Sequence, residues 1–185
     1  MGEKPADFRL ALILGGARSG KSRYGVSLAA SFPPPHLFVA TGEAGDAEMA
    51  ARIAHHQKER GPGWDMVEAP LALAEALAAA QGRYGVILVD CLTLWLSNLM
   101  LAGGPTAPAV EPACDHLVAG LEQARTPTIL VSNEVGLGVV PENPLAREFR
   151  DRLGWLHQRL ARAADLVVLV VAGLPAVIKS VSSER

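Results

Sequence analysis

One segment of the sequence combines glycines, a lysine and a hydroxyl side chain at a spacing that suits phosphate binding. Gly15–Ser22 reads GGARSGKS and fits the pattern GxxxxGK[ST]. Glycines let the backbone turn so that successive amide N–H groups point at phosphate oxygens, at the positive end of the following helix. We then expect Lys21 to reach the β- and γ-phosphates and the Ser22 hydroxyl to bind Mg²⁺. The segment predicts nucleotide binding rather than a glycine-rich turn with an incidental lysine.

A carboxylate that ends an apolar run fits the same chemistry. Tyr84–Asp90 reads YGVILVD, which predicts a buried strand with Asp90 at its carboxyl end. Ligands of open α/β sheets bind at those ends, so Asp90 is expected to share Mg²⁺ with Ser22. The alternative is that Asp90 caps a helix that starts at Cys91.

A pair of histidines, His55 and His56, lies on a predicted helix over Asp46–Arg60. One stripe of this helix is wholly polar and is expected to face water; it holds Glu48, Arg52, His55 and Glu59. His56 instead shares a face with Met49 and Ile53, so it should point toward the protein body. The residues alone favour a part-buried, hydrogen-bonded histidine over a functional one.

Two further segments carry polar residues. Asn133–Asn143 reads NEVGLGVVPEN after a predicted strand, and it suits a substrate loop and a structural connection equally well. The helix after it mixes Glu148 and Asp151 with several arginines, which predicts a solvated face without nucleic-acid meaning. The arginines are Arg147, Arg150, Arg152, Arg159 and Arg162.

The elements that must position these residues alternate between short apolar runs and longer helical patterns. The predicted strands cover Leu10–Gly16, His36–Thr41, Trp64–Glu68, Tyr84–Asp90, Pro127–Ser132 and Asp165–Val171, with Val177–Val181 as an antiparallel edge strand. The predicted helices cover Lys21–Ser31, Asp46–Arg60, Leu71–Gln81, Leu92–Leu101, Cys114–Ala124 and Leu145–Ala164. This alternation predicts an α/β fold with a mostly parallel central sheet and helices on both faces.

The domain organisation expected is one nucleotide-binding domain over residues 1–185, with residues 1–9 as an N-terminal extension to which we assign no role. Gly103–Pro112 is the only linker-like stretch, and it is too short to separate two domains.

Composition excludes several classes of protein. The 185 residues are 50% hydrophobic and 19% charged, which excludes a disordered chain. The net charge of −2 and the pI near 6.2 argue against nucleic-acid binding. The longest apolar run, Leu166–Ile178, is too short for a membrane span. Two cysteines without metal-ligand spacing and an N-terminus without a secretory signal favour the cytoplasm.

Taken together, these segments resemble the bifunctional adenosylcobinamide kinase / adenosylcobinamide-phosphate guanylyltransferase family of cobalamin biosynthesis. The likeness runs from Leu10 onward over nearly the whole chain. Its distinctive part is the histidine pair followed by the NEVG loop. The matching segments are GGARSGKS, VAT at Val39–Thr41, EMAARIAHH at Glu48–His56, Trp64–Glu68, VDCLTLWLSNL at Val89–Leu99, NEVGLGVVPEN, RDRLGWLHQRLA within Arg147–Ala164, and VVLVVAG.

The resemblance implies two reactions. ATP or GTP first phosphorylates the hydroxyl on the aminopropanol arm of adenosylcobinamide. GTP then gives its GMP moiety to that phosphate through a covalent histidine, which falls on His56, and yields adenosylcobinamide-GDP and pyrophosphate. Lys21 would act with His56 in catalysis by stabilising charge on the phosphates. Spacing identifies no general base for the kinase step.

The resemblance also implies a P-loop NTPase fold of the RecA-like kind, a homotrimer, and a set of nucleotide contacts. Mg²⁺ would lie on Ser22 and Asp90. The contacts to GTP or ATP would fall on Gly15, Gly16, Ala17, Arg18, Ser19, Gly20, Lys21, Ser22, Thr41, Gly42, Glu43, Gln57, Lys58, Glu59, Arg60, Glu68 and Asp90.

Three other functions were weighed against this one. A simple P-loop small-molecule kinase would have no histidine intermediate. A GTP-dependent switch would need a guanine-reading NKxD-type motif, which the chain lacks. A motor acting on DNA is disfavoured by the acidic charge balance. Small molecules are therefore the expected partners, with no nucleic acid and no membrane span.

Overall fold

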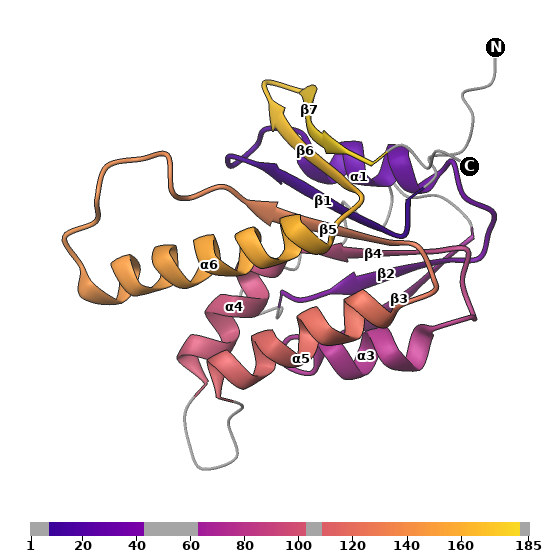
Figure 1. Cartoon of the computed structure of the whole chain (residues 1–185), viewed down its shortest axis with the longest axis horizontal. Helices are drawn as coiled ribbons and strands as arrows, with labels where there is room; N and C mark the ends of the chain where they lie inside the picture. The colour runs from indigo at the N-terminus through magenta and orange to yellow at the C-terminus, as the bar shows by residue number, and fades with distance from the viewer. Residues whose placement is uncertain (1–7, 43–62, 103–108, 182–185) are drawn as a thin grey trace.

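The computed structural model describes residues 8–42, 63–102 and 109–181, and its strands form a seven-stranded sheet in the order β3-β2-β4-β5-β1-β6-β7 (Figure 1). The strands are β1 (Leu10–Gly15), β2 (His36–Ala40), β3 (Trp64–Glu68), β4 (Val86–Asp90), β5 (Thr128–Asn133), β6 (Leu166–Val171) and β7 (Leu174–Ser180). The helices are α1 (Lys21–Ala29), α3 (Leu73–Ala80), α4 (Leu92–Leu101), α5 (Val110–Gln123) and α6 (Pro144–Ala163). All pairings are parallel except that of β6 with β7, so the predicted mostly parallel α/β sheet is confirmed.

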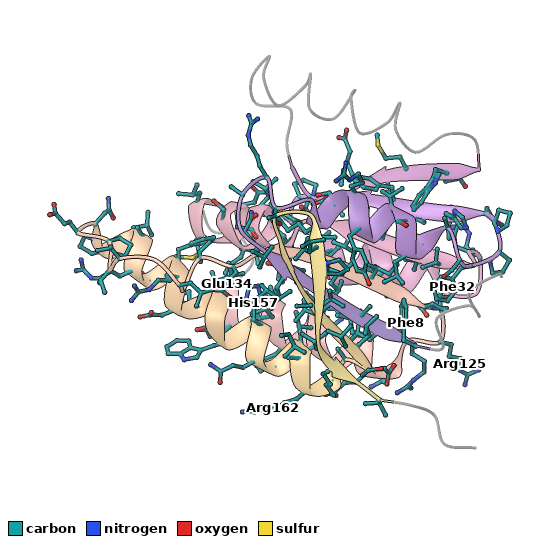
Figure 2. The ribbon with its side chains drawn as sticks, turned by 90° about the horizontal axis from the view of Figure 1, so that it is seen from above. Phe8, Phe32, Arg125, Glu134, His157 and Arg162 are labelled. Carbon is teal, nitrogen blue, oxygen red and sulfur yellow. The ribbon has the colours of Figure 1, made fainter. Side chains whose placement is uncertain are left out.

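The residues just before β1 belong to the packed structure, although the sequence assigned them no role. The Phe8 ring is buried and packs edge-on against Phe32, with ring centroids 5.2 Å apart (Figure 2). The Arg9 backbone N–H donates to Asp165 Oδ2 at 2.8 Å, and its carbonyl accepts from Thr128 N–H at 2.8 Å. These contacts fix the start of β1 against β5 and β6.

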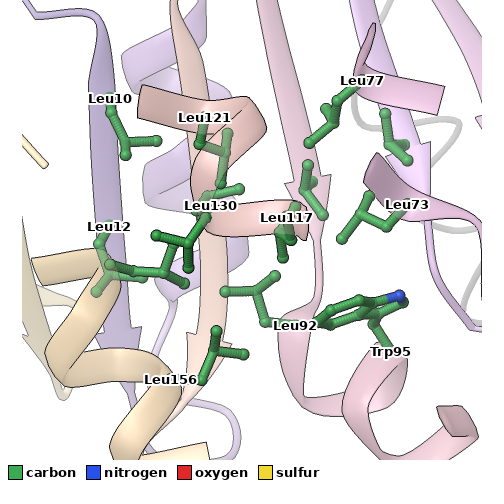
Figure 3. Close-up of a cluster of buried hydrophobic side chains, with 14 of the residues drawn as sticks. Leu10, Leu12, Leu73, Leu77, Leu92, Trp95, Leu117, Leu121, Leu130 and Leu156 are labelled. Carbon is green, nitrogen blue, oxygen red and sulfur yellow. The ribbon is translucent and has the colours of Figure 1, made fainter. Parts of the chain in front are cut away.

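Strand residues alternate between two apolar layers, one on each face of the sheet. In β1, Leu10 and Leu12 join the layer under α3, α4, α5 and α6, whereas Ala11 and Ile13 join the layer under α1. Figure 3 shows the first layer, in which the Trp95 ring packs among leucines from strands and helices. Because both faces of the inner strands β1, β2, β4 and β5 are covered, these strands are mostly apolar, as the uninterrupted runs in the sequence predict.

Two elements begin three or more residues before the position predicted from the sequence. β7 begins at Leu174 rather than Val177, because the chain already reverses at Ala172 and Gly173, whose φ angles are 50° and 81°. Pro175 lies inside β7, where it is tolerated because β7 is an edge strand. α5 begins at Val110, so the end of the expected linker Gly103–Pro112 is helical. Proline fits there because the first turn of a helix needs no N–H from it.

The arginines of α6 do not simply face water. Arg152 forms ion pairs with Glu148 and with Glu111 of α5, and Arg159 Nη1 lies 2.7 Å from Asp115 Oδ1. These ion pairs join α6 to α5, a contact that the sequence analysis did not predict. Among the helices that the structure describes, none is long and apolar enough to cross a membrane.

A close backbone approach before β4 gives a test of this packing. A Cβ on Gly85 would lie 1.7 Å from the Pro33 carbonyl oxygen, while Gly85 N–H donates to Pro35 O at 2.9 Å. We expect Gly85→Ala to lower the free energy of unfolding by about 2 kcal/mol or more, because the two segments must separate.

Gly120→Ala is the matched control. Gly120 is exposed within α5, and no atom lies near the position of its missing Cβ. Gly120→Ala should therefore raise the free energy of unfolding by about 0.5–1 kcal/mol, because alanine favours the helix over glycine. Urea denaturation measures both. Equal effects of the two substitutions would contradict the close approach.

Candidate nucleotide-binding site

The loop Gly15–Ser22 leaves the carboxyl end of β1 and opens α1, as the sequence predicts. Gly15 must lack a side chain, because a Cβ there would lie 2.5 Å from Ser19 Oγ and 2.6 Å from Val170 O. Gly20 has a φ of 93°, a conformation that residues with a Cβ rarely adopt. Both glycines are thus required by the shape of the loop.

Backbone hydrogen bonds tie the loop to the strands on either side of β1. Glu134 N–H, just past β5, donates to Gly15 O at 3.0 Å. Gly173 N–H, in the turn between β6 and β7, donates to Ser19 O at 2.8 Å. Within the loop, Ser19 N–H donates to Gly16 O at 3.2 Å. The loop is therefore held in shape by contacts within the protein.

The start of α1 is suited to an anion. No side chain caps it, and its first turn carries no acidic residue, so the amide dipoles there are not neutralised by the protein. Among buried side-chain oxygens and nitrogens of the described residues, the Ser19 hydroxyl lacks a hydrogen-bond partner. Buried hydroxyls are nearly always bonded, so this one fits a loop completed by phosphate oxygens.

Lys21 is buried in the loop, only 8% exposed, and its Nζ donates to Gly16 O at 3.1 Å. Burial lowers the pKa of the Lys21 ammonium, while the negative charge of Asp90 acts in the opposite direction. Asp90, at the end of β4, therefore lies near enough to Lys21 to act on its charge. A bound phosphate would add negative charge next to the buried ammonium and so stabilise its charged form.

Asp90 ends β4, and the N-cap residue of α4 is Cys91, so the alternative in which Asp90 caps that helix is wrong. Ser22, the second residue of α1, offers a hydroxyl beside the buried Lys21. Within the described residues no group of three His, Cys, Asp or Glu side chains could hold a metal. A hydroxyl and one carboxylate nevertheless suit Mg²⁺, which takes its remaining oxygens from phosphates and water.

Thr41 fixes the backbone beside Asp90. Its hydroxyl donates to Cys91 O at 2.7 Å and accepts from Cys91 N–H at 2.8 Å, and the side chain is fully buried. Asn98 Nδ2 donates to Thr41 O at 2.7 Å. The resemblance implies a nucleotide contact at Thr41, whose hydroxyl is bonded to the backbone of Cys91. The role of Asn98 was not foreseen.

The remaining predicted contacts are spread along the same edge or fall elsewhere. Gly42 is part-exposed. Glu68, at the end of β3, is exposed. It pairs in register with Ala40 of β2, and Ala40 pairs in register with Asp90 of β4. Three strands separate β3 from β1, so the structure does not bring Glu68 to the loop. The other predicted residues lie outside the described part of the chain: Glu43, His56, Gln57, Lys58, Glu59 and Arg60.

A buried polar chain behind the loop was missed by the sequence analysis. His157 of α6 is 7% exposed, and its Nε2 lies 2.7 Å from Ser132 Oγ, while its Nδ1 lies 4.0 Å from Glu134 Oε2. Ser132 Oγ lies 3.1 Å from Thr93 Oγ1, which accepts from Asn133 N–H at 2.7 Å. Only the NEVG loop, flagged as a possible substrate segment, pointed to this region.

Burial gives His157 a testable influence on stability. It lowers the pKa of the imidazole from 6.5 to about 4, with Glu134 acting in the opposite direction. Between these values the unfolded chain binds a proton that the folded chain does not, so stability falls as the pH drops below about 6.5. We expect wild type to lose about 3 kcal/mol more than His157→Gln between pH 7 and pH 4.

Urea denaturation at both pH values measures this difference. His116→Gln is the control, because His116 is exposed beside Glu75. If the His157→Gln protein loses stability as steeply as wild type, the imidazole does not remain neutral in the folded state.

Solved structures similar to this chain share its fold. An ATPase from a bacterial type III secretion system superposes with a TM-score of 0.57 at 13% identity, covering 91% of this chain and 56% of that one. The flagellar accessory protein FlaH from Methanocaldococcus jannaschii gives 0.51 at 14% identity, covering 93% and 78%. These likenesses place the sheet and its phosphate loop among P-loop NTPase folds.

Relatives in sequence are much closer. The bifunctional adenosylcobalamin biosynthesis protein CobP of Pseudomonas aeruginosa is 46% identical over 168 residues, which cover 91% of this chain and 96% of that protein. The protein CobU of Salmonella typhimurium, with the same description, is 43% identical over 179 residues, covering 91% and 98%. The sequence model of cobinamide kinase / cobinamide phosphate guanyltransferase matches residues 11–178. The chain belongs to the cobinamide kinase / cobinamide phosphate guanyltransferase family.

Proposed function

We propose that the chain carries out two successive transfers in cobalamin biosynthesis. In the first, ATP or GTP phosphorylates the hydroxyl on the aminopropanol arm of adenosylcobinamide. In the second, GTP donates GMP to the new phosphate, which yields adenosylcobinamide-GDP and releases pyrophosphate. The observation that carries the proposal is the family match over residues 11–178, which includes both the phosphate loop and the histidine pair.

The kinase step would use the loop as a preformed phosphate cradle. The acceptor oxygen attacks the γ-phosphorus, and the bond from that phosphorus to the β-phosphate oxygen breaks. The Lys21 ammonium and the amides at the start of α1 would stabilise the charge that develops on the phosphate oxygens, which is supported by the burial of Lys21 in the loop and the uncapped start of α1. Mg²⁺, held by Ser22 and Asp90, would neutralise further phosphate charge.

The guanylyl transfer would use His56 as a covalent carrier. A neutral imidazole nitrogen attacks the α-phosphorus of GTP and displaces pyrophosphate. The phosphate oxygen of the second substrate then attacks the same phosphorus and breaks the N–P bond. His56 lies outside the described residues, so this role is supported by the resemblance and by its face on the predicted helix.

We also propose that the chain acts as one nucleotide-binding domain and assembles as a homotrimer in the cytoplasm. The single sheet of the described residues supports the first point. The assembly is supported by apolar side chains exposed on β7, where Leu174, Val177 and Ile178 are 73%, 60% and 65% exposed. A subunit contact would cover such an edge.

The covalent step is tested by intact mass after incubation with GTP and Mg²⁺. Wild type and His55→Ala should each gain one acid-labile GMP, and His56→Ala should gain none while still binding GTP. An adduct on the His56→Ala protein would move the nucleophile elsewhere. No adduct on any of the three proteins, with GTP binding intact, would favour a simple small-molecule kinase.

A further inference from the structure

Glu134 occupies a distinctive place beside the phosphate loop. It directly follows β5, the strand that separates β1, which carries the loop, from β4, which carries Asp90. Its backbone N–H is bonded to Gly15 O at 3.0 Å, so its position is fixed relative to the first residue of the loop. A carboxylate at this point of the sheet edge lies at the site where ligands of such sheets bind.

The carboxylate of Glu134 is held but remains accessible. Gly136 N–H donates to Oε1 at 2.5 Å, and Oε2 lies 4.0 Å from His157 Nδ1. Figure 2 labels Glu134 and His157 next to each other. The side chain is 24% exposed. Within the described residues no lysine or arginine forms an ion pair with it.

The buried chain behind Glu134 holds the His157 ring in place. Asn133 N–H donates to Thr93 Oγ1, Thr93 Oγ1 lies 3.1 Å from Ser132 Oγ, and Ser132 Oγ lies 2.7 Å from His157 Nε2. When the Ser132 hydroxyl donates to Nε2, a neutral His157 carries its proton on Nδ1, the ring nitrogen 4.0 Å from Glu134 Oε2. The chain therefore keeps the imidazole beside the carboxylate.

Serine, histidine and glutamate in this order resemble a nucleophilic triad, but the arrangement cannot act as one. Ser132 is fully buried, so no substrate can reach its hydroxyl. The accessible end of the chain is Glu134. Any chemistry therefore takes place at the carboxylate, and the serine and histidine serve to hold it.

Under the proposed function the kinase step requires a group that accepts the proton of the acceptor hydroxyl. Lys21 is a cation bonded to the loop, and Asp90 is assigned to Mg²⁺. The acceptor must approach the γ-phosphorus from the side opposite the β-phosphate, beyond the end of the loop. Glu134 is the carboxylate whose backbone is bonded to that loop.

We propose that Glu134 is the general base of the phosphoryl transfer and that His157 is its positioning residue. As the acceptor oxygen attacks the γ-phosphorus, its proton passes to Glu134 Oε2. The electron pair of the breaking bond stays on the β-phosphate oxygen of the departing nucleoside diphosphate. The carboxylic acid then releases the proton to water. The guanylyl transfer needs no such base, because its attacking groups are a neutral imidazole and a phosphate anion.

The experiment measures both half-reactions on the same protein. Glu134→Gln keeps the size of the side chain and its acceptor for Gly136 N–H but cannot take a proton. We expect its kcat for phosphorylation of adenosylcobinamide to fall at least ~100-fold with the KM for nucleotide little changed. Formation of the GMP adduct from GTP should proceed at the wild-type rate. Glu142→Gln, on the same exposed loop, is the control and should leave both half-reactions intact.

Variants of His157 test the positioning role. The amide of His157→Asn can replace the Nδ1 donor, whereas His157→Leu cannot, so kcat should fall further in the leucine variant at an unchanged KM. The assignment is overturned if Glu134→Gln phosphorylates within about threefold of wild type, far less than the ~100-fold or greater loss expected for a lost base. It is also overturned if that variant loses phosphorylation and adduct formation together, which would indicate a structural role. If the wild-type protein does not phosphorylate adenosylcobinamide, the proposed function is wrong, and the assignment of Glu134 as general base is wrong with it.

Discussion

The arrangement of the site depends on the absence of a side chain at Gly15. The space that a Cβ would take is filled by Ser19 Oγ and Val170 O, so the loop folds back tightly over the end of β1. That tight return lets Glu134 and Gly173, from the two flanking strands, donate to the loop carbonyls. The phosphate-binding amides are therefore positioned before a ligand arrives, which reduces the ordering that binding requires.

Strand order determines which charges meet at this loop. Because β5 and β4 follow β1 across the sheet, Glu134 and Asp90 come at the same carboxyl edge as the loop, whose Lys21 is nearly inaccessible to water. The two carboxylates have different surroundings. Asp90 acts electrostatically on Lys21, whereas Glu134 faces a neutral imidazole. Different environments for neighbouring carboxylates allow one to serve a metal and the other to move a proton.

Local sequence patterns predicted most of the helices and strands. They did not predict contacts between residues that are far apart in the sequence. The bounds of α4, Leu92–Leu101, and the phosphate loop followed from apolar spacing and from a motif with its own mechanism. The Thr41–Cys91 pair joins residues 50 apart and the Ser132–His157 pair residues 25 apart. Such pairs depend on strand order and helix placement, which no single segment encodes. The same limit explains why Glu134 was only part of a flagged loop.

We propose that both transfers use one nucleotide site, built on the phosphate loop. Titration calorimetry of the His56→Ala protein, which should bind GTP without forming the GMP adduct, with GTP and Mg²⁺ and then with ATP as the displacing nucleotide, tests this directly. The account predicts one GTP bound per chain and its complete displacement by ATP, because both nucleotides would use the Gly15–Ser22 loop. Two independent GTP sites per chain, or GTP that ATP cannot displace, would contradict it.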